Sequence, residues 1–288
     1  MSAAAHVEVK PRSAGPAVSA ERIAGLYVEV LEGGPGTPVL LSAGLGGSGH
    51  YWRPQLDALR QARPVILYDH RGTGRSGGDL PADYGIDDMG ADIALILDGL
   101  GCGSAHVVGH AAGAMAALAL ATKRPELLAS VTSVNGWLKP DPHFLRCFDI
   151  RLTLLEAGGP TAYAKAQPLF LYPPRWIAAH ADLIDQEMAA QLASFPDKAI
   201  LIARIDALRA ADMTGRLDAI DLPAMVVASE DDMLVPDRCA EPLAAALSRY
   251  RPARLERLPY GGHAVNVTQA EAFNALLADF FETVAPPA

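Results

Sequence analysis

Short apolar segments recur along the chain, and a helical pattern of apolar residues follows most of them. The first segment, residues 22–32, alternates apolar and polar side chains as a half-buried strand does, and the next ones are continuously apolar. Strands are predicted at 22–32, 38–43, 64–69, 105–108 and 128–134. Helices are predicted at 51–61, 87–100 and 112–122. This alternation predicts a parallel sheet with helices on both faces.

The alternation is interrupted between residues 136 and 217, where helical periodicity dominates and no segment has the length and composition of a strand. Further elements are predicted after the interruption: strands at 222–229 and 254–258, and helices at 236–247 and 269–284. One α/β core made of residues 21–135 and 218–288, with a helical lid inserted at 136–217, explains this order and the length of 288 residues. Residues 1–20, rich in Ala, Pro and Ser, are predicted to form a flexible tail.

The composition is that of a globular protein, because 50% of the residues are hydrophobic and 20% are charged. The net charge of −9 argues against a nucleic-acid partner, and no apolar stretch has the length of a signal sequence or membrane span, so no membrane partner is expected. Cys102, Cys147 and Cys239 have neither disulfide nor zinc spacing, which favours a reduced, cytoplasmic protein without a metal. No cofactor is expected, and the sequence leaves open whether the chain forms a homodimer.

The segment Gly109-His110-Ala111-Ala112-Gly113 lies at a predicted strand-to-helix junction. It fits the G-x-S-x-G nucleophile elbow of α/β hydrolases at both glycines but has Ala111 at the serine position. The two glycines alone could also serve tight strand–helix packing. Without the hydroxyl, a hydrolase built on this elbow does not use a serine triad.

The glycine-rich loop at 42–49 follows an early strand and supports the hydrolase interpretation. Its Leu45 amide and the Ala112 amide at the start of the next helix are the two predicted donors of an oxyanion hole. Phosphate binding is disfavoured, because the loop lacks the Lys-Ser/Thr ending of a P-loop.

A carboxylate and a histidine follow in the chain order expected of this fold. Asp232 comes after the strand at 222–229, with Asp231 as the nearest competitor, and His263 comes after the last strand. Both carboxylates could instead cap the next helix. The histidine at the expected place favours a His263–Asp232 dyad, whereas His110 is interpreted as mainly structural and Asp69 as part of a charged, loop-fixing turn.

Over residues 22–284 the chain resembles the α/β hydrolases, and specifically the RutD hydrolases of the uracil-degrading Rut pathway. The resemblance is carried by the motifs GLGGSG (44–49), YW (51–52), PQL (54–56), YD (68–69), RGTG (71–74), VGHA (108–111), SVNGWL (133–138), RCF (146–148), AQPLFLYP (166–173), PYGGHA (259–264) and NVT (266–268). RutD-like proteins also have alanine at the nucleophile position. The resemblance implies hydrolysis of a small product of pyrimidine degradation: carbamate to ammonia and carbon dioxide, or aminoacrylate to malonic semialdehyde.

These observations predict a hydrolase in which His263, oriented by Asp232, acts as general base on a water beside Ala111. The pocket for a small-molecule substrate is predicted to be shaped by Asn135, Trp137, Arg146 and Tyr172, with Arg146 offering charge to a carboxylate or carbamate. Each of these four residues could instead serve packing or the surface. Two other functions are open to the sequence: a catalytically silent ligand-binding protein, and an esterase or enol-lactonase whose serine was replaced by alanine.

Overall fold

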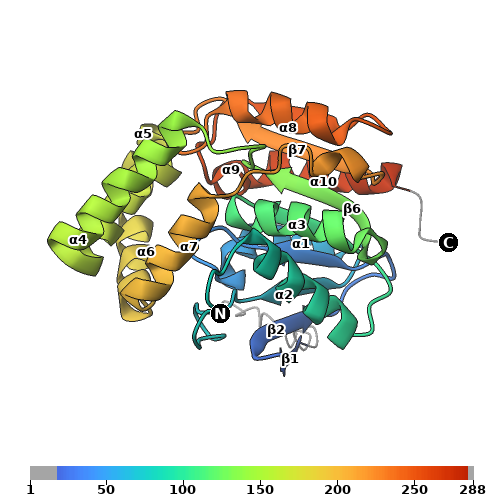
Figure 1. The fold of residues 1–288 in the computed structure, drawn as a ribbon, viewed down its shortest axis with the longest axis horizontal. Helices are drawn as coiled ribbons and strands as arrows, with labels where there is room; N and C mark the ends of the chain where they lie inside the picture. The colour runs from blue at the N-terminus through green and yellow to red at the C-terminus, as the bar shows by residue number, and fades with distance from the viewer. Residues whose placement is uncertain (1–17, 285–288) are drawn as a thin grey trace, which may run out of the picture.

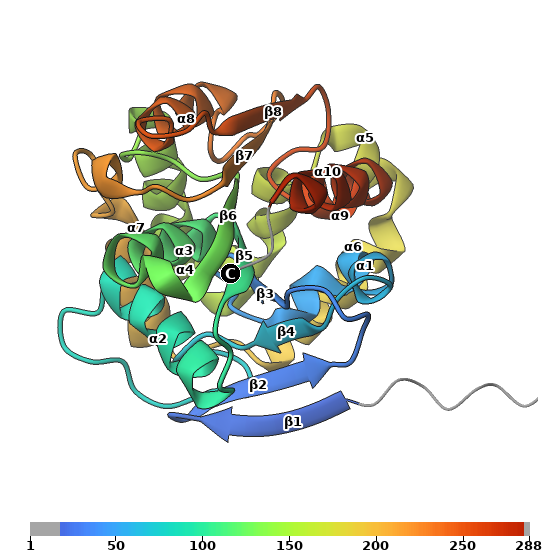
Figure 2. The same cartoon turned by 90° about the vertical axis from the view of Figure 1, so that its right-hand side faces the viewer.

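The computed structural model describes residues 18–284. Figure 1 shows the fold, and eight strands form one sheet in the order β1-β2-β4-β3-β5-β6-β7-β8, which can be followed in Figure 2. The strands are β1 (Val18–Ile23), β2 (Leu26–Leu31), β3 (Val39–Ser42), β4 (Val65–Tyr68), β5 (Ala105–His110), β6 (Leu128–Val134), β7 (Ala224–Ser229) and β8 (Arg254–Leu258). From β4 to β8 all neighbours are parallel, whereas β1 and β2 are antiparallel. This is the predicted α/β-hydrolase sheet.

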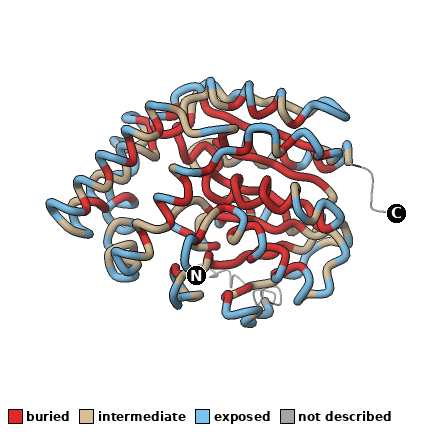
Figure 3. Tube along the Cα trace, in the orientation of Figure 1, coloured by how far each residue is buried: buried red, intermediate tan, exposed pale blue. Residues whose placement is uncertain are grey.

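Helices cover both faces of the sheet, as predicted. One core cluster packs α2 (Ile86–Gly99), α3 (Ala112–Lys123) and α8 (Ala240–Leu247) on one face, and a second packs α1 (Arg53–Arg60) and α10 (Ala270–Thr283) on the other (Figure 2). The helix α3 is buried over ten consecutive residues, and together with the central strands it forms the buried interior in Figure 3. Short helical turns occur at η1 (Gly49–Trp52), η2 (Pro125–Leu127), η3 (Leu217–Ala219), η4 (Asp237–Cys239) and α9 (Val265–Thr268).

The N-terminal region differs from the prediction. The single strand predicted at 22–32 is a hairpin of β1 and β2, which turns at Ala24 (φ 51°) and Gly25 (φ 85°). Such a two-residue turn needs positive φ at both positions and is usually marked by Asn-Gly or Asp-Gly, so Ala-Gly gave little signal. Residues 1–17 of the predicted tail lie outside the described residues, and 18–20 belong to β1.

Between β6 and β7 the chain forms helices, and Figure 1 shows them at one end of the sheet. They are α4 (Pro142–Leu171), α5 (Pro174–Ala179), α6 (Ala181–Ala193) and α7 (Lys198–Arg209). The helix α4 is broken at Gly159, whose φ of 65° no ordinary helical residue adopts, and Pro160 follows. Within residues 18–284 no helix combines the length and the apolar character needed to cross a bilayer.

Candidate active site

The turn between β5 and α3 places Ala111 in a backbone conformation that side-chain-bearing residues rarely adopt. Its φ is 48° and its ψ −105°, and its amide donates to the Val134 carbonyl (2.9 Å). Glycine is required on both sides of the turn. A Cβ on Gly109 would lie 2.2 Å from the Gly113 carbonyl oxygen, and one on Gly113 would lie 2.1 Å from that of Ser42. The glycines therefore let α3 approach β3 and β5 closely.

The loops after β7 and β8 bring His263 against Asp232. The distance from His263 Nδ1 to Asp232 Oδ2 is 2.8 Å, and both side chains are buried. The other carboxylate oxygen, Oδ1, accepts from the amides of Leu234 (2.7 Å) and Val235 (2.9 Å). A carboxylate can only accept, so the neutral imidazole carries its proton on Nδ1 and leaves Nε2 free as a base. His263 itself lines the large cavity described below.

The neighbouring Asp231 has a different task. Its Oδ1 accepts from the Ser229 hydroxyl (2.7 Å) and from the amides of Gly261 (2.9 Å) and Gly262 (2.8 Å). Gly261 and Gly262 have positive φ and directly precede His263. Asp231 therefore holds the loop that presents the histidine, and Asp232 is the carboxylate in contact with it.

The backbone of His263 is also held in place. Its carbonyl oxygen accepts from Asn135 Nδ2 (2.6 Å) and from His110 Nε2 (2.8 Å). Burial and the neighbouring His263 hold the pKa of His110 well below its usual value, so His110 is neutral. The prediction that Asn135 shapes the pocket was wrong. Its side chain is not in the cavity wall, because its amide is used to fix the His263 carbonyl.

The Gly44–Gly47 turn carries the predicted oxyanion donor Leu45. The Gly47 amide donates to the Gly44 carbonyl (2.9 Å), and a guanidinium nitrogen of Arg204 donates to the Leu45 carbonyl (3.3 Å). Leu45 lines the cavity beside Ala111. Ala112 is the first residue of α3, where the amide has no acceptor within its own helix.

A cavity of about 540 Å³ lies between the carboxyl ends of the strands and the helices α4, α6 and α7. Each parallel strand contributes to it through the loop that follows: Leu45 after β3, Gly74 after β4, Ala111 after β5, Trp137 after β6, Leu234 after β7 and His263 after β8. Ligands of open α/β sheets bind at this edge. The cavity therefore lies at the ligand-binding edge of the sheet, and His263 of the dyad is part of its wall.

Two of the four predicted pocket residues, Trp137 and Tyr172, line this cavity. The Trp137 indole donates to the Ala211 carbonyl (3.2 Å), and the Tyr172 hydroxyl donates to Glu187 (3.0 Å). Arg146 does not line the cavity, because it points to solvent from α4 and is exposed. The prediction for Arg146 was wrong.

Sequence reasoning missed two buried arginines in the cavity wall, Arg151 and Arg204. A signal for Arg151 was present. It follows Phe144 and Phe148 at helical spacing, so it belongs to the buried face of α4, whereas Arg146 lies off that face.

The charged turn after β4 fixes a loop at the cavity, as predicted. Asp69 accepts from the Gly49 amide (2.9 Å) and from the Arg75 amide (2.9 Å) and side chain (2.8 Å). These bonds and the Arg75 charge hold the pKa of Asp69 below its usual value, although its burial works in the opposite direction.

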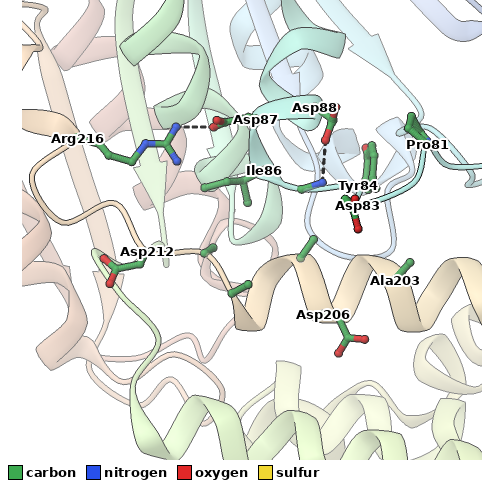
Figure 4. A pocket seen from close by; sticks show the side chains of 14 residues that line it. Pro81, Asp83, Tyr84, Ile86, Asp87, Asp88, Ala203, Asp206, Asp212 and Arg216 are labelled. Carbon is green, nitrogen blue, oxygen red and sulfur yellow. Dashed lines mark hydrogen bonds and ion pairs between the residues drawn. The ribbon is translucent and has the colours of Figure 1, made fainter.

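A second cavity, of about 520 Å³, lies on the other side of α7 (Figure 4). Its wall is acidic, and the carboxylates are Asp83, Asp87, Asp88, Asp206 and Asp212. Asp87 pairs with Arg216, and Asp88 accepts from the Gly85 amide (2.9 Å). Its lining includes no histidine, and therefore no counterpart of the dyad.

Comparison with known proteins shows the family to which the chain belongs. The family model described as "alpha/beta hydrolase fold" matches residues 37–173. A protein of Caulobacter vibrioides named "Putative carbamate hydrolase RutD" is 48% identical over 261 residues, which cover 90% of this chain and 96% of that protein. The chain belongs to the RutD family of α/β hydrolases.

Other relatives are consistent with membership in the RutD family. The protein of the same name from Klebsiella pneumoniae is 43% identical over 255 residues, which cover 88% of this chain and 95% of that protein. Among solved structures, an enol-lactonase from Burkholderia xenovorans superposes with a TM-score of 0.80 at 23% identity, covering 92% of this chain and 100% of that chain. At this identity the likeness shows the fold alone.

Proposed function

We propose that this RutD-family chain hydrolyses a small carbon–nitrogen substrate of pyrimidine degradation, carbamate or aminoacrylate, with a His–Asp dyad and water. The observation that carries the proposal is the 2.8 Å contact between His263 and Asp232 at a cavity that Ala111 also lines. The relatives carry the name "Putative carbamate hydrolase RutD", which supports the same chemistry.

In this mechanism Nε2 of His263 takes a proton from a water beside Ala111, and the water oxygen bonds to the substrate carbon. The amides of Leu45 and Ala112 hold the oxygen on which charge develops when that carbon carries a carbonyl or carboxylate oxygen. The imidazolium, stabilised by Asp232, then returns the proton to the leaving nitrogen. Carbamate and water yield ammonia and bicarbonate, whereas the imine form of aminoacrylate and water yields malonic semialdehyde and ammonia.

The magnitudes suit such substrates. A positioned general base supplies about 10²–10⁴-fold, and one oxyanion donor about 10²–10³-fold. For stable esters and amides, a covalent intermediate lowers the barrier further by splitting one difficult step into two easier ones. Carbamate and aminoacrylate decompose slowly unaided, so a dyad without a nucleophile is sufficient for them.

The test is ammonia release from each substrate by the unmodified protein and by His263→Ala. We expect His263→Ala to lower kcat by about 10²–10⁴-fold, since the general base is lost. His180→Ala is the matched control, because His180 is exposed and lies outside the cavity wall. A His263→Ala protein as active as the control would contradict the proposal.

We also propose a cytoplasmic location. Cys102, Cys147 and Cys239 are all free thiols, which fits a reducing compartment. Cell fractionation tests this, and recovery of the protein outside the cytoplasm would overturn it.

A further inference from the structure

Arg151 is a buried cation without a carboxylate partner. Its side chain is 2% exposed, and none of the ion pairs found within residues 18–284 includes it. It donates to the Tyr163 hydroxyl, whereas its Nε is buried with no acceptor. A guanidinium has five N–H donors and stays charged at any ordinary pH. Leaving such a charge buried and unpaired costs several kcal/mol, so a stable protein is expected to gain something from it.

The surroundings of Arg151 tolerate its charge without using its donors. Its Cζ lies 4.8 Å from the ring centre of Phe148, 5.0 Å from that of Tyr163 and 5.8 Å from that of Phe170. Aromatic faces attract a cation but accept no directed pair of N–H bonds. The guanidinium is therefore held in the cavity wall with most of its hydrogen-bonding capacity unused.

Arg204, the other buried arginine of the wall, is used by the protein itself. It donates to the carbonyls of Arg71 (3.3 Å) and Leu45 (3.3 Å) and contacts His70 Nδ1 (3.0 Å). It therefore ties helix α7 to the loops after β3 and β4. Arg151 has no such bonds to neighbouring loops.

The charge of the cavity wall favours an anion. The arginines in the wall are Arg53, Arg151 and Arg204, and the one carboxylate in it is Glu187, which already accepts from Tyr172. A negatively charged ligand would therefore enter a region of positive potential. A planar carboxylate matches the paired N–H groups of Arg151.

We propose that Arg151 binds the carboxylate of the substrate and selects for it, on the side of the cavity formed by α4. This inference rests on the proposed function. Within the described residues, no hydrogen bond or ion pair joins Arg151 to His263, Asp232 or Ala111. In this proposal the carboxylate at Arg151 is a handle separate from the carbon that water attacks.

A separate handle favours a three-carbon amino acrylate over carbamate. In carbamate the carboxylate carbon is itself the carbon attacked, so it cannot be held at Arg151 and react at the dyad together. In the imine form of a three-carbon substrate, water adds to the far C=N carbon, the C–N bond breaks, ammonia leaves and the carboxylate is unchanged.

The test compares Arg151→Met with Arg146→Met, an exposed arginine of the same helix. The dissociation constants of propionate and of neutral propionamide are measured by NMR titration, beside kcat and KM for ammonia release. We expect Arg151→Met to raise the dissociation constant of propionate by about 10- to 100-fold, as for a lost hydrogen bond to a charged group. Propionamide should be almost unaffected, Arg151→Lys should recover part of the loss, and Arg146→Met should change neither ligand.

Several outcomes would overturn the proposal: no propionate binding by the unmodified protein, equal weakening of both ligands in Arg151→Met, or the same loss in Arg146→Met. The melting temperature of Arg151→Met tests whether Arg151 has a merely structural role. Since Arg151→Met removes an unpaired buried charge, the melting temperature should not fall. Binding of propionate that depends on Arg151, with no ammonia released from either substrate, would instead reject the proposed function and leave the carboxylate site standing.

Discussion

At the scale of single residues, Asp231 and Asp232 are neighbouring carboxylates with different roles. Asp231 holds the glycines before His263, and Asp232 contacts the imidazole. Chain order alone favoured Asp232, but only the contacts separate the two.

The choice between Arg146 and Arg151 could have been made from the sequence, because helical spacing from Phe144 and Phe148 selects Arg151. The role of Asn135 could not, since it depends on a contact 128 residues away in the chain.

Asp232→Asn should disable the dyad with little change of shape. The amides of Leu234 and Val235 hold one oxygen of residue 232, so the new NH₂ group turns toward His263 Nδ1. That contact favours the imidazole tautomer with its proton on Nε2, which cannot act as a base. We expect kcat for ammonia release to fall by about 10²–10⁴-fold.

Asp231→Asn is the control for this experiment, because its remaining side-chain oxygen can still accept from Gly261 and Gly262. Its kcat should stay within about tenfold of that of the unmodified protein. Equal losses in the two variants would show that Asp232 acts by holding the loop and not by setting the tautomer.

At the scale of elements, the contact of α3 with β3 depends on Gly113. A Cβ there would lie 2.1 Å from the Ser42 carbonyl oxygen, which belongs to rigid backbone. We expect Gly113→Ala to lower the free energy of unfolding in urea by about 1–3 kcal/mol.

Gly103→Ala is the matched control for Gly113→Ala, since nothing lies within 4 Å of its Cβ position and its φ is not positive. Its free energy of unfolding should stay within about 0.5 kcal/mol of that of the unmodified protein, or rise slightly. A Gly113→Ala protein as stable as this control would contradict the close approach of α3 to β3.

Strands and helices with strong periodicity were predictable, and one turn was not. Strand β6 begins and ends where the apolar pattern does, because it lies inside the sheet between β5 and β7 and its side chains are buried. The edge strand β8 also has the predicted bounds, although only Leu255 and Leu258 in it are apolar. The β1–β2 hairpin was missed because Ala24 and Gly25 carry a weak turn signal. The break of α4 at Gly159 was also missed, although Gly-Gly-Pro follows a helical pattern at 158–160.

At the scale of the whole molecule, buried histidines should make the fold sensitive to acid. Burial lowers the pKa of His106 to about 3 and holds those of His70 and His110 well below 6.5. All three are neutral in the folded protein, whereas the unfolded chain binds a proton at each below about pH 6.5. The contribution of these three histidines to the free energy of unfolding is therefore fully present above that pH and is lost as the pH falls below it. We expect a loss of about 1.4 kcal/mol per pH unit for each histidine, measured by urea unfolding between about pH 6 and pH 5.

His106→Gln supplies the control for this slope, because His106 packs between Ser130 and Phe281, outside the cavity wall. The slope of its unfolding free energy against pH should be smaller by about 1.4 kcal/mol per pH unit, the value for one proton. An unchanged slope would show that His106 is not a neutral group in the folded state.

The central claim is that water, and not a residue of the chain, attacks the substrate beside Ala111. Intact-mass spectrometry of the protein, quenched with acid during steady turnover of aminoacrylate, tests it most directly. The account predicts that the mass stays that of the unmodified chain, since no covalent intermediate forms. A protein carrying the mass of a substrate fragment, formed and lost at a rate matching kcat, would contradict it.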